Sequence, residues 1–285
     1  MTATVSIALC TYNGEKFLDL QLESLRHQTV LPDELIVCDD ASSDRSVEIV
    51  EAFARRVSFP VRLFRNARNL GYVKNFEQAI SHCTQDLVFL CDQDDLWDAR
   101  KIEIVRGVFQ SEPQVGLSLH DFVRIDAQGG PFESGLELYG ERQVPSSDLP
   151  DEVRQHSILP FMLPYPRAWC GCMMAFRRSF LEVILPIFPG KGHDDWILKT
   201  LAPLTQTRFH GLPLVRYRIH DANANSDEVG HTAWAIFVRK LRRQIHNVRK
   251  GYSKKNFYRS VLERIAASGR DVKYPQLLAL YRRFA

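Results

Sequence analysis

Apolar and polar residues follow one another along the first ninety positions in a pattern that predicts strands separated by helices. Short, β-prone apolar runs occur at residues 5–10, 34–38, 61–64 and 87–91. Between these runs, apolar residues recur at the spacing of amphipathic helices, for example from Phe17 to Leu25. Strands separated by helices are typical of βαβ units, so the pattern predicts an α/β fold with a mainly parallel sheet flanked by helices.

The pattern weakens after residue 111. Residues 118–125 predict one more strand, and the polar, Pro-dotted stretch that continues to residue 168 predicts an irregular region that faces the substrate. Around residues 233–245 and 257–267, apolar residues recur at helical spacing among Lys and Arg. We therefore expect one α/β domain over residues 1–230 and a helical C-terminal extension over residues 231–285.

Charge is distributed unevenly between these two parts. The whole chain has 285 residues and a formal net charge of +3. Residues 231–285 carry 14 Lys and Arg against two acidic residues, so this extension is strongly basic and the first 230 residues are acidic. A basic amphipathic segment suits an anionic membrane surface; solvated helix faces and a nucleic-acid contact are the alternatives.

Cysteine usage and hydropathy predict the compartment. The six cysteines are scattered, and the close pair Cys170 and Cys172 has neither redox nor zinc-ligand spacing. The sequence contains no apolar stretch of about 18 residues and no signal-type N-terminus. We expect reduced thiols and a cytoplasmic protein, which the basic extension would attach peripherally to the inner face of the membrane.

Polar side chains follow three of the predicted strands. Asp92-Gln93-Asp94-Asp95 comes after the strand at 87–91, Asp39-Asp40 after the strand at 34–38, and Thr11-Tyr12-Asn13 after the first strand. The carboxyl ends of parallel strands meet at one edge of a sheet, so we expect these groups to line one site. Each group taken alone is also explained by a turn or a helix cap.

The residue types at this edge suit a nucleotide and a metal. Three neighbouring carboxylates repel one another unless a cation neutralises them, and Mg²⁺ or Mn²⁺ commonly binds one or two carboxylates together with phosphate oxygens. Tyr12 offers an aromatic face for a nucleobase, and Asp40 can accept a hydrogen bond from a pyrimidine N3–H.

Five motifs, in this order, resemble glycosyltransferase family 2, whose members have the GT-A fold. They are Ser6-Ile7-Ala8-Leu9-Cys10-Thr11-Tyr12-Asn13, Asp39-Asp40-Ala41-Ser42-Ser43-Asp44, Asn69-Leu70-Gly71-Tyr72-Val73-Lys74-Asn75, Asp92-Gln93-Asp94-Asp95 and His193-Asp194-Asp195-Trp196. The resemblance covers about residues 5–225. Tyr217-Arg218-Ile219-His220 resembles an element of bacterial rhamnosyltransferase-like members.

The resemblance implies roles for individual residues. Those implied in nucleotide-sugar binding are Thr11, Tyr12, Asn13, Asp40, Lys74, Asn75, Asp92, Asp94 and Arg218. Those implied in binding Mg²⁺ or Mn²⁺ are Asp94, Asp95 and His220, with Asp94 or Asp95 as the direct ligand. Many relatives have Arg where this chain has Lys74, and lysine lacks the bidentate fork of arginine.

The resemblance also implies where the acceptor is activated. The acidic residue before the aromatic of the fifth motif is the general base in the family; this maps to Asp195, with Asp194 as its neighbour. Helix capping is the alternative for both. Trp169, Gly171 and Trp196 are assigned to the acceptor side, and a buried strand is the alternative for residues 169–176.

These observations predict an inverting glycosyltransferase. Its donor would be a UDP- or dTDP-sugar such as dTDP-rhamnose, and its acceptor a saccharide or polyprenyl-linked saccharide of the cell surface. A sugar-phosphate nucleotidyltransferase is one alternative, but it requires a Gly-rich basic loop that residues 11–16 match poorly. A non-catalytic nucleic-acid-binding protein is the other, and the acidic first 230 residues argue against it.

Overall fold

The computed structural model describes residues 2–131, 170–221 and 253–285. Four predictions lie wholly or largely outside the described residues: the irregular stretch that continues to residue 168, the acceptor role of Trp169, the domain boundary at residue 230 and the helix around residues 233–245.

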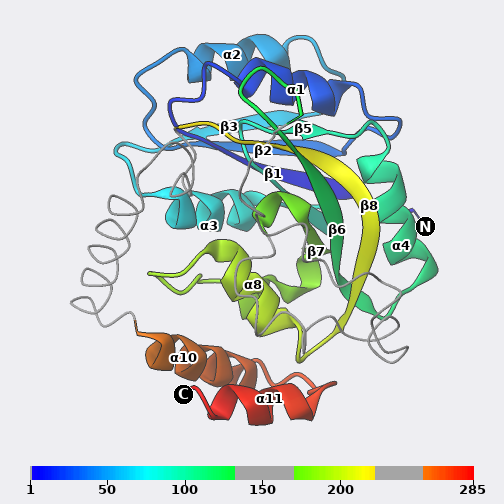
Figure 1. Ribbon diagram of the computed structural model, residues 1–285, viewed down its shortest axis with the longest axis vertical. Coiled ribbons are helices and arrows are strands. Elements are labelled where there is room, and N and C mark those ends of the chain that lie inside the picture. Colours follow the sequence, from blue (N-terminus) through cyan, green and yellow to red (C-terminus); the bar gives the residue numbers. More distant parts are fainter. Residues whose placement is uncertain (1, 132–169, 222–252) are drawn as a thin grey trace.

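The described strands form one mixed sheet at the centre of the molecule (Figure 1). They are β1 (Val5–Thr11), β2 (Glu34–Asp39), β3 (Val61–Arg65), β4 (Leu87–Cys91), β5 (Leu96–Trp97), β6 (Val115–Ile125), β7 (Met174–Arg177) and β8 (Gln206–Arg218). Their order is β3-β2-β1-β4-β7-β6-β8-β5. The first four are mutually parallel, which confirms the predicted α/β fold, and β7 runs antiparallel between β4 and β6.

Helices cover both faces of this sheet. The described α-helices are α1 (Leu18–Arg26), α2 (Ser46–Ala54), α3 (Tyr72–His82), α4 (Lys101–Ser111), α7 (Leu181–Ile184), α8 (His193–Leu201), α10 (Lys254–Ala267) and α11 (Pro275–Arg282). One hydrophobic core joins the sheet to α1, α2 and α4, and a second joins it to α3, α7, α8, α10 and α11. Because strand β1 is covered on both faces, all seven of its residues are buried.

The register of the parallel strands brings three loops together. Thr11 pairs with Asp39 on one side of β1, and Leu9 pairs with Cys91 on the other. Strands β1, β2 and β4 therefore end at the same edge, and the segments that follow them start side by side. The predicted convergence of the Thr11, Asp40 and Asp92 segments follows from this register.

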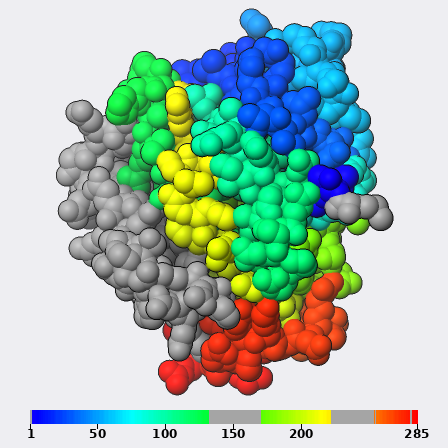
Figure 2. Space-filling model, turned by 90° about the vertical axis from the view of Figure 1, so that its right-hand side faces the viewer, coloured from blue at the N-terminus to red at the C-terminus, as the bar shows by residue number. Residues whose placement is uncertain are grey.

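Helix α10 packs on helix α8, and helix α11 packs on α10, at the end of the molecule remote from α1 and α2 (Figures 1 and 2). Phe257 and Tyr258 of α10 are buried, and the Phe257 ring lies edge-on to Trp196 of α8 at 5.9 Å between ring centroids. The described part of the predicted extension thus shares a core with the α/β fold. No helix within the described ranges is both long and apolar enough to cross a bilayer.

Candidate functional site

Gln93 joins the loop after β1 to the acidic turn after β4. Its Oε1 accepts hydrogen bonds from the Thr11 hydroxyl and the Tyr12 backbone N–H, both at 2.8 Å, and its Nε2 donates to the Tyr12 carbonyl at 3.2 Å. The Tyr12 side chain is 47% exposed, so its ring is accessible at this edge. The sequence did not predict this role of Gln93, because nothing in the pattern of a glutamine between aspartates indicates which backbone it binds.

Gly14 leaves the space that Gln93 occupies. A Cβ at residue 14 would lie 2.3 Å from Gln93 Oε1 and 3.0 Å from Thr11 Oγ1. We expect Gly14→Ala to displace Gln93, lower the free energy of unfolding by about 1–3 kcal/mol and weaken nucleotide binding. Gly107→Ala is the matched control, because nothing lies within 4 Å of its added Cβ in helix α4 and alanine favours a helix. Urea denaturation of both variants measures the difference; equal stability would contradict the packing argument.

Asp40 holds the loop that precedes helix α3. Its carboxylate accepts hydrogen bonds from Asn66 Nδ2 and from the backbone N–H groups of Leu70 and Gly71, each at 2.8 Å. Asp40 is 2% exposed. Asn13 links the same edge to the loop after β2, because its N–H donates to the Ser42 hydroxyl and its Oδ1 accepts from the Ser43 N–H, both at 2.9 Å. The predicted contact of Asp40 with a base stays a prediction.

Asn75 of the third motif, residues 69–75, holds this loop through hydrogen bonds inside the fold. Asn75 is 2% exposed; its Nδ2 donates to the Cys38 carbonyl and its Oδ1 accepts from Asn66. Both polar atoms of the amide thus have a partner inside the fold, and the predicted contact of Asn75 with the donor stays a prediction. The Lys74 ammonium forms an ion pair with Glu77 at 2.7 Å on an exposed face of α3.

Arg218, at the end of β8, holds the acidic turn in place through hydrogen bonds to Asp94 and Asp95. Its backbone N–H donates to Asp95 Oδ1 at 3.0 Å, and its Nε donates to the Asp94 carbonyl at 2.8 Å. The guanidinium also lies over the Phe17 ring, 4.8 Å from the centroid, and the residue is 1% exposed. Arg218 therefore positions the turn, and its predicted contact with the donor stays a prediction.

The carboxyl groups of the turn face different neighbours. Asp94 Oδ2 lies 3.0 Å from His220 Nε2, so the structure brings together two of the predicted metal ligands. Asp95 is 1% exposed, and its Oδ2 is buried without a hydrogen-bond partner among the described residues. Asp92 is partly exposed. Carboxylate oxygens beside an imidazole nitrogen form a set that fits Mn²⁺ or Mg²⁺.

Burial and mutual repulsion perturb these acids. Burial, reinforced by the charges of Asp95 and Asp94, raises the pKa of Asp92 well above its usual range. Burial, with Asp94 as the next contribution, raises the pKa of Asp95 to about 7. A cation that neutralised the cluster would lower both pKa values, because it favours the ionised carboxylates.

These shifts predict how stability depends on pH in the absence of a divalent cation. The folded chain retains protons that the unfolded chain releases near pH 4, so the free energy of unfolding falls between about pH 4 and pH 7. We expect Mn²⁺ to raise the melting temperature by several degrees at about pH 7.5 and by less at about pH 5. Thermal scans with Mn²⁺ and with chelator measure this; an equal effect at both pH values would contradict it.

Asp194 and Asp195 lie in the first turn of helix α8 but face different groups. Asp195 forms an ion pair with Lys199, one turn further along the helix. Asp194 lies close enough to the acidic turn for its charge to contribute to the raised pKa of Asp92. Burial, followed by the charge of Asp195, raises the pKa of Asp194 to about 6. Lys199 was missed from the sequence, because a lysine four residues after an acid is common on solvated helices.

Gly171 is buried against His193. A Cβ at Gly171 would lie 2.4 Å from His193 Nε2, and the imidazole stacks on Phe76 with 3.9 Å between ring centroids. Burial lowers the pKa of His193 to about 3, so the ring is neutral. This packing explains the glycine without the predicted acceptor contact.

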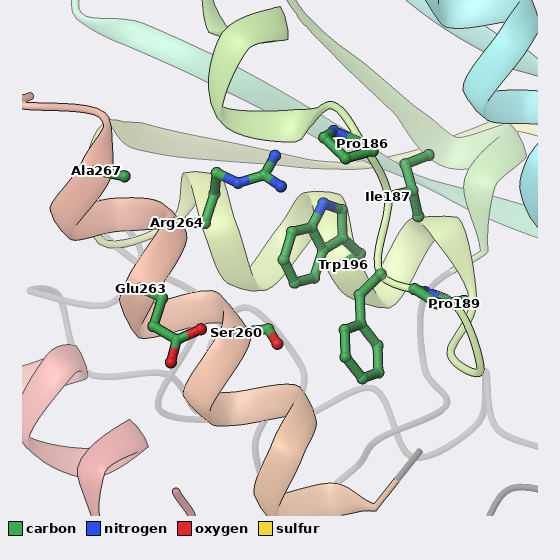
Figure 3. A pocket seen from close by; sticks show the side chains of 9 residues that line it. Pro186, Ile187, Pro189, Trp196, Ser260, Glu263, Arg264 and Ala267 are labelled. Carbon is green, nitrogen blue, oxygen red and sulfur yellow. The ribbon is translucent and has the colours of Figure 1, made fainter. Parts of the chain in front are cut away.

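Trp196 belongs to the core, which differs from its predicted acceptor role. It is 1% exposed and its Nε1 donates to the Ile184 carbonyl at 2.7 Å. Its ring borders a groove of about 320 Å³ between α10 and the Pro186–Pro189 loop (Figure 3). Residues two apart on a helix point about 200° apart, so this groove lies on the side of α8 opposite Asp194.

Comparison with known proteins identifies the family of this chain. Residues 6–185 match Glycosyl transferase family 2. An uncharacterized glycosyltransferase of Nostoc sp. is 26% identical over 235 residues, which are 80% of this chain and 69% of the relative. The abequosyltransferase RfbV of Salmonella typhimurium is 27% identical over 156 residues, which are 52% of this chain and 46% of that protein.

Two solved structures are similar in fold. S. aureus TarS in complex with UDP-GlcNAc has a TM-score of 0.62 and 18% identity, covering 98% of this chain and 71% of the TarS chain. The mannosyltransferase PcManGT of Pyrobaculum calidifontis, in complex with GDP-Man and Mn²⁺, has a TM-score of 0.56 and 18% identity, covering 99% and 80%. The fold is thus of GT-A type, and the family match spans well over half of the sequence: this chain belongs to glycosyl transferase family 2.

Proposed function

We propose that this protein transfers a glycosyl group from a nucleoside-diphosphate sugar to a hydroxyl group, with inversion at the anomeric carbon. The observation that carries the proposal is the Gln93 bridge, which joins the Tyr12 loop to the acidic turn at Asp92–Asp95, near enough to Asp194 for the charge of Asp194 to act on Asp92. This arrangement provides a nucleobase surface, a site for the diphosphate and a base. Membership of the family favours glycosyl transfer over nucleotidyl transfer and nucleic-acid binding.

The donor would lie along this edge, and a UDP- or dTDP-sugar is the proposed substrate, with dTDP-rhamnose first among candidates. Tyr12 would stack on the base, supported by the Gln93 bridge to Thr11. Among the described residues, Asp40 Oδ2 accepts one hydrogen bond, from the Gly71 N–H, which leaves a lone pair for the base edge. Asp92, like Asp94, is partly exposed, and it would meet the sugar or ribose hydroxyls.

Asp94 and His220 are the residues proposed to hold Mg²⁺ or Mn²⁺. Asp94 is favoured over Asp95 as the direct ligand because the Arg218 N–H already occupies Asp95 Oδ1. A bound divalent cation would offset the negative charge that develops on the departing diphosphate.

Asp194 is proposed as the general base in place of Asp195. A base needs a free carboxylate that faces the reacting hydroxyl, whereas Asp195 is held by Lys199. The pKa of about 6 leaves Asp194 mainly ionised at neutral pH yet more basic than an ordinary aspartate. It would take the proton of the acceptor hydroxyl as that oxygen attacks the anomeric carbon and the nucleoside diphosphate leaves.

A donor panel tests the proposal directly. The full chain is incubated with UDP- and dTDP-sugars in the presence of Mn²⁺ or Mg²⁺, and thermal stabilisation and release of nucleoside diphosphate are measured. We expect at least one donor to raise the melting temperature and to be hydrolysed slowly without acceptor. Absence of binding and of hydrolysis with every donor would overturn the proposed function.

The acceptor is proposed to be a saccharide, free or linked to a polyprenyl carrier, in the synthesis of a cell-surface polysaccharide. The exposed cations of the C-terminal helices would then contact an anionic membrane surface: Lys255, Arg259, Lys273, Arg282 and Arg283. Phe257 and Tyr258 are buried, so the attraction would be mainly electrostatic. We expect co-sedimentation with phosphatidylglycerol vesicles that high salt abolishes; binding to neutral vesicles alone would contradict this.

A further inference from the structure

Lys101 is a buried cation to which the proposed reaction gives no role. It is the first residue of helix α4 and is 0% exposed. Its Nζ donates to the Cys172 carbonyl at 2.6 Å and lies over the Trp97 ring, 3.5 Å from the ring centroid. Both partners are formally neutral. Because an ammonium group that is removed from water is unfavourable unless negative charge lies nearby, its burial needs a further explanation.

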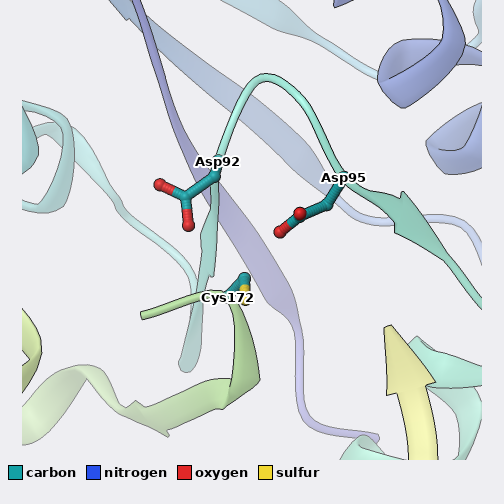
Figure 4. Close-up of side chains that lie close together, drawn as sticks. All are labelled: Asp92, Asp95 and Cys172. Carbon is teal, nitrogen blue, oxygen red and sulfur yellow. The ribbon is translucent and has the colours of Figure 1, made fainter. Parts of the chain in front are cut away.

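The acidic turn supplies the negative charge. The Cys172 Sγ and one carboxylate oxygen each of Asp92 and Asp95 lie within 4.8 Å of one another (Figure 4). Burial, the largest contribution, raises the pKa of both carboxyls, and the charge of Lys101 acts in the opposite direction on both. A hydrogen bond from the Cys172 thiol also lowers the pKa of Asp95. Cys172 therefore connects the two, since its carbonyl contacts Lys101 and its thiol contacts Asp95.

The segment that carries Cys172 also contacts the helix of the proposed base. This segment is the short 3-10 turn Gly171–Met173, and all three of its residues are buried. A Cβ at Gly171 would lie 2.4 Å from His193 Nε2, so the turn packs directly on the imidazole. His193 is the first residue of helix α8 and precedes Asp194. The Gly171–Met173 turn is therefore packed between the acidic turn and the start of α8.

A lysine suits this position for two reasons. An ammonium group forms a charge-assisted hydrogen bond to a carbonyl, which is stronger than a bond from a neutral donor. The face of an indole ring also attracts a cation. Trp97 is 5% exposed and belongs to strand β5, which pairs with β8 in the central sheet. The tie from Lys101 to the Cys172 carbonyl is thus anchored in the core, and the Gly171–Met173 turn cannot move away without breaking it.

We propose that Lys101 is a positioning residue, which ties the Gly171–Met173 turn to the core and so holds the acidic turn and Asp194 at the spacing that glycosyl transfer needs. In an inverting displacement the leaving diphosphate and the attacking hydroxyl lie on opposite sides of the anomeric carbon, so the groups that serve them must be placed together. The positioning role rests on the proposed function, whereas the tie belongs to the fold and can be tested without any substrate.

Alkylation of Cys172 tests the tie. The full chain is treated with iodoacetamide, and mass spectrometry measures the rate at each cysteine. Cys172 is 0% exposed, and we expect Lys101→Met to raise its rate of alkylation by at least about tenfold, because the carbonyl loses its charged donor and the turn opens. Loss of the cation alone would make the thiolate harder to form, so faster alkylation reports opening. Cys83, which is 2% exposed at the end of α3, should stay protected.

Kinetics of the same variant test the positioning role. With a donor that the wild type hydrolyses, Lys101→Met should lower kcat for release of nucleoside diphosphate by about tenfold or more and change the donor KM by less than about threefold. Lys101→Arg keeps a charge and N–H donors, so it should stay closer to the wild type in both measurements. Arg100→Met removes the exposed cation of the preceding residue and should match the wild type.

Three results would overturn the proposal. The first is an equal rate of alkylation at Cys172 in Lys101→Met and in the wild type. The second is an unchanged kcat in a variant whose Cys172 is exposed. The third is equal alkylation of Cys83 and Cys172 in Lys101→Met, which would assign Lys101 to the stability of the whole fold. A wild-type chain that hydrolyses no donor would instead contradict the proposed function, and alkylation would still decide whether the tie exists.

Discussion

Asp194→Asn should lower kcat by about 10³-fold and leave nucleotide binding nearly unchanged, because a neutral amide cannot accept the acceptor proton. The same substitution should raise the melting temperature. Burial and the charge of Asp195 raise the pKa of Asp194 to about 6, so its ionised form destabilises the fold at neutral pH. Lower activity with higher stability separates a catalytic role from a merely structural one. Steady-state kinetics and thermal scans of one preparation measure both.

Asp195→Asn is the matched control at the neighbouring position. It should retain kcat within about tenfold but destabilise the chain by roughly 2 kcal/mol, because Lys199 is 7% exposed and loses its ion-pair partner. The acidic limb of its pH profile should move to lower pH, since one charge that raises the pKa of Asp194 is gone. If Asp195→Asn is the inactive variant and Asp194→Asn the active one, the assignment of the base is wrong.

The first half of the fold was predictable because its strands are buried on both faces. Such strands appear as continuous apolar runs, and β1, β2 and β4 were found on that basis. Strand β8 was missed because eight of its 13 residues are partly or fully exposed, and Arg208 and His210 interrupt any apolar run. Strand β5 has only two residues, which is too short for a pattern to indicate.

The site was predictable in place but less so in detail. Strand ends of a parallel sheet fix where the polar loops meet, so Tyr12 and the acidic turn were correctly expected at one edge. Arg218 was expected to bind an anion, yet its guanidinium donates to backbone carbonyls, which every residue has and which leave no trace in a sequence. Adjacent residues on a helix point about 100° apart, so Asp194 and Asp195 face different neighbours. The ion pair of Lys199 with Asp195 shows which of the two carboxylates is engaged, and the sequence did not indicate this ion pair.

Asp94→Asn should lower kcat by about 10²-fold or more and raise the Mn²⁺ concentration needed for half-maximal activity, because an amide oxygen carries no charge to hold the cation. Binding of nucleotide in the presence of chelator should change little, since that contact depends on the loops at Tyr12 and Asp40. Mn²⁺ titrations of initial rates and of nucleotide affinity separate the two effects.

Asp98→Asn provides the control within the same segment. Its side chain is exposed and accepts a hydrogen bond from the Arg100 N–H at the start of helix α4, which an asparagine oxygen can also accept. His220→Gln should fall between the two variants, because it removes the imidazole 3.0 Å from Asp94 while keeping the carboxylate. The Mn²⁺ concentration needed for half-maximal activity should therefore be highest for Asp94→Asn, intermediate for His220→Gln and lowest for Asp98→Asn. A Mn²⁺ requirement of Asp94→Asn equal to that of Asp98→Asn would mean that the cation is held elsewhere in the turn, with Asp95 as the remaining direct ligand.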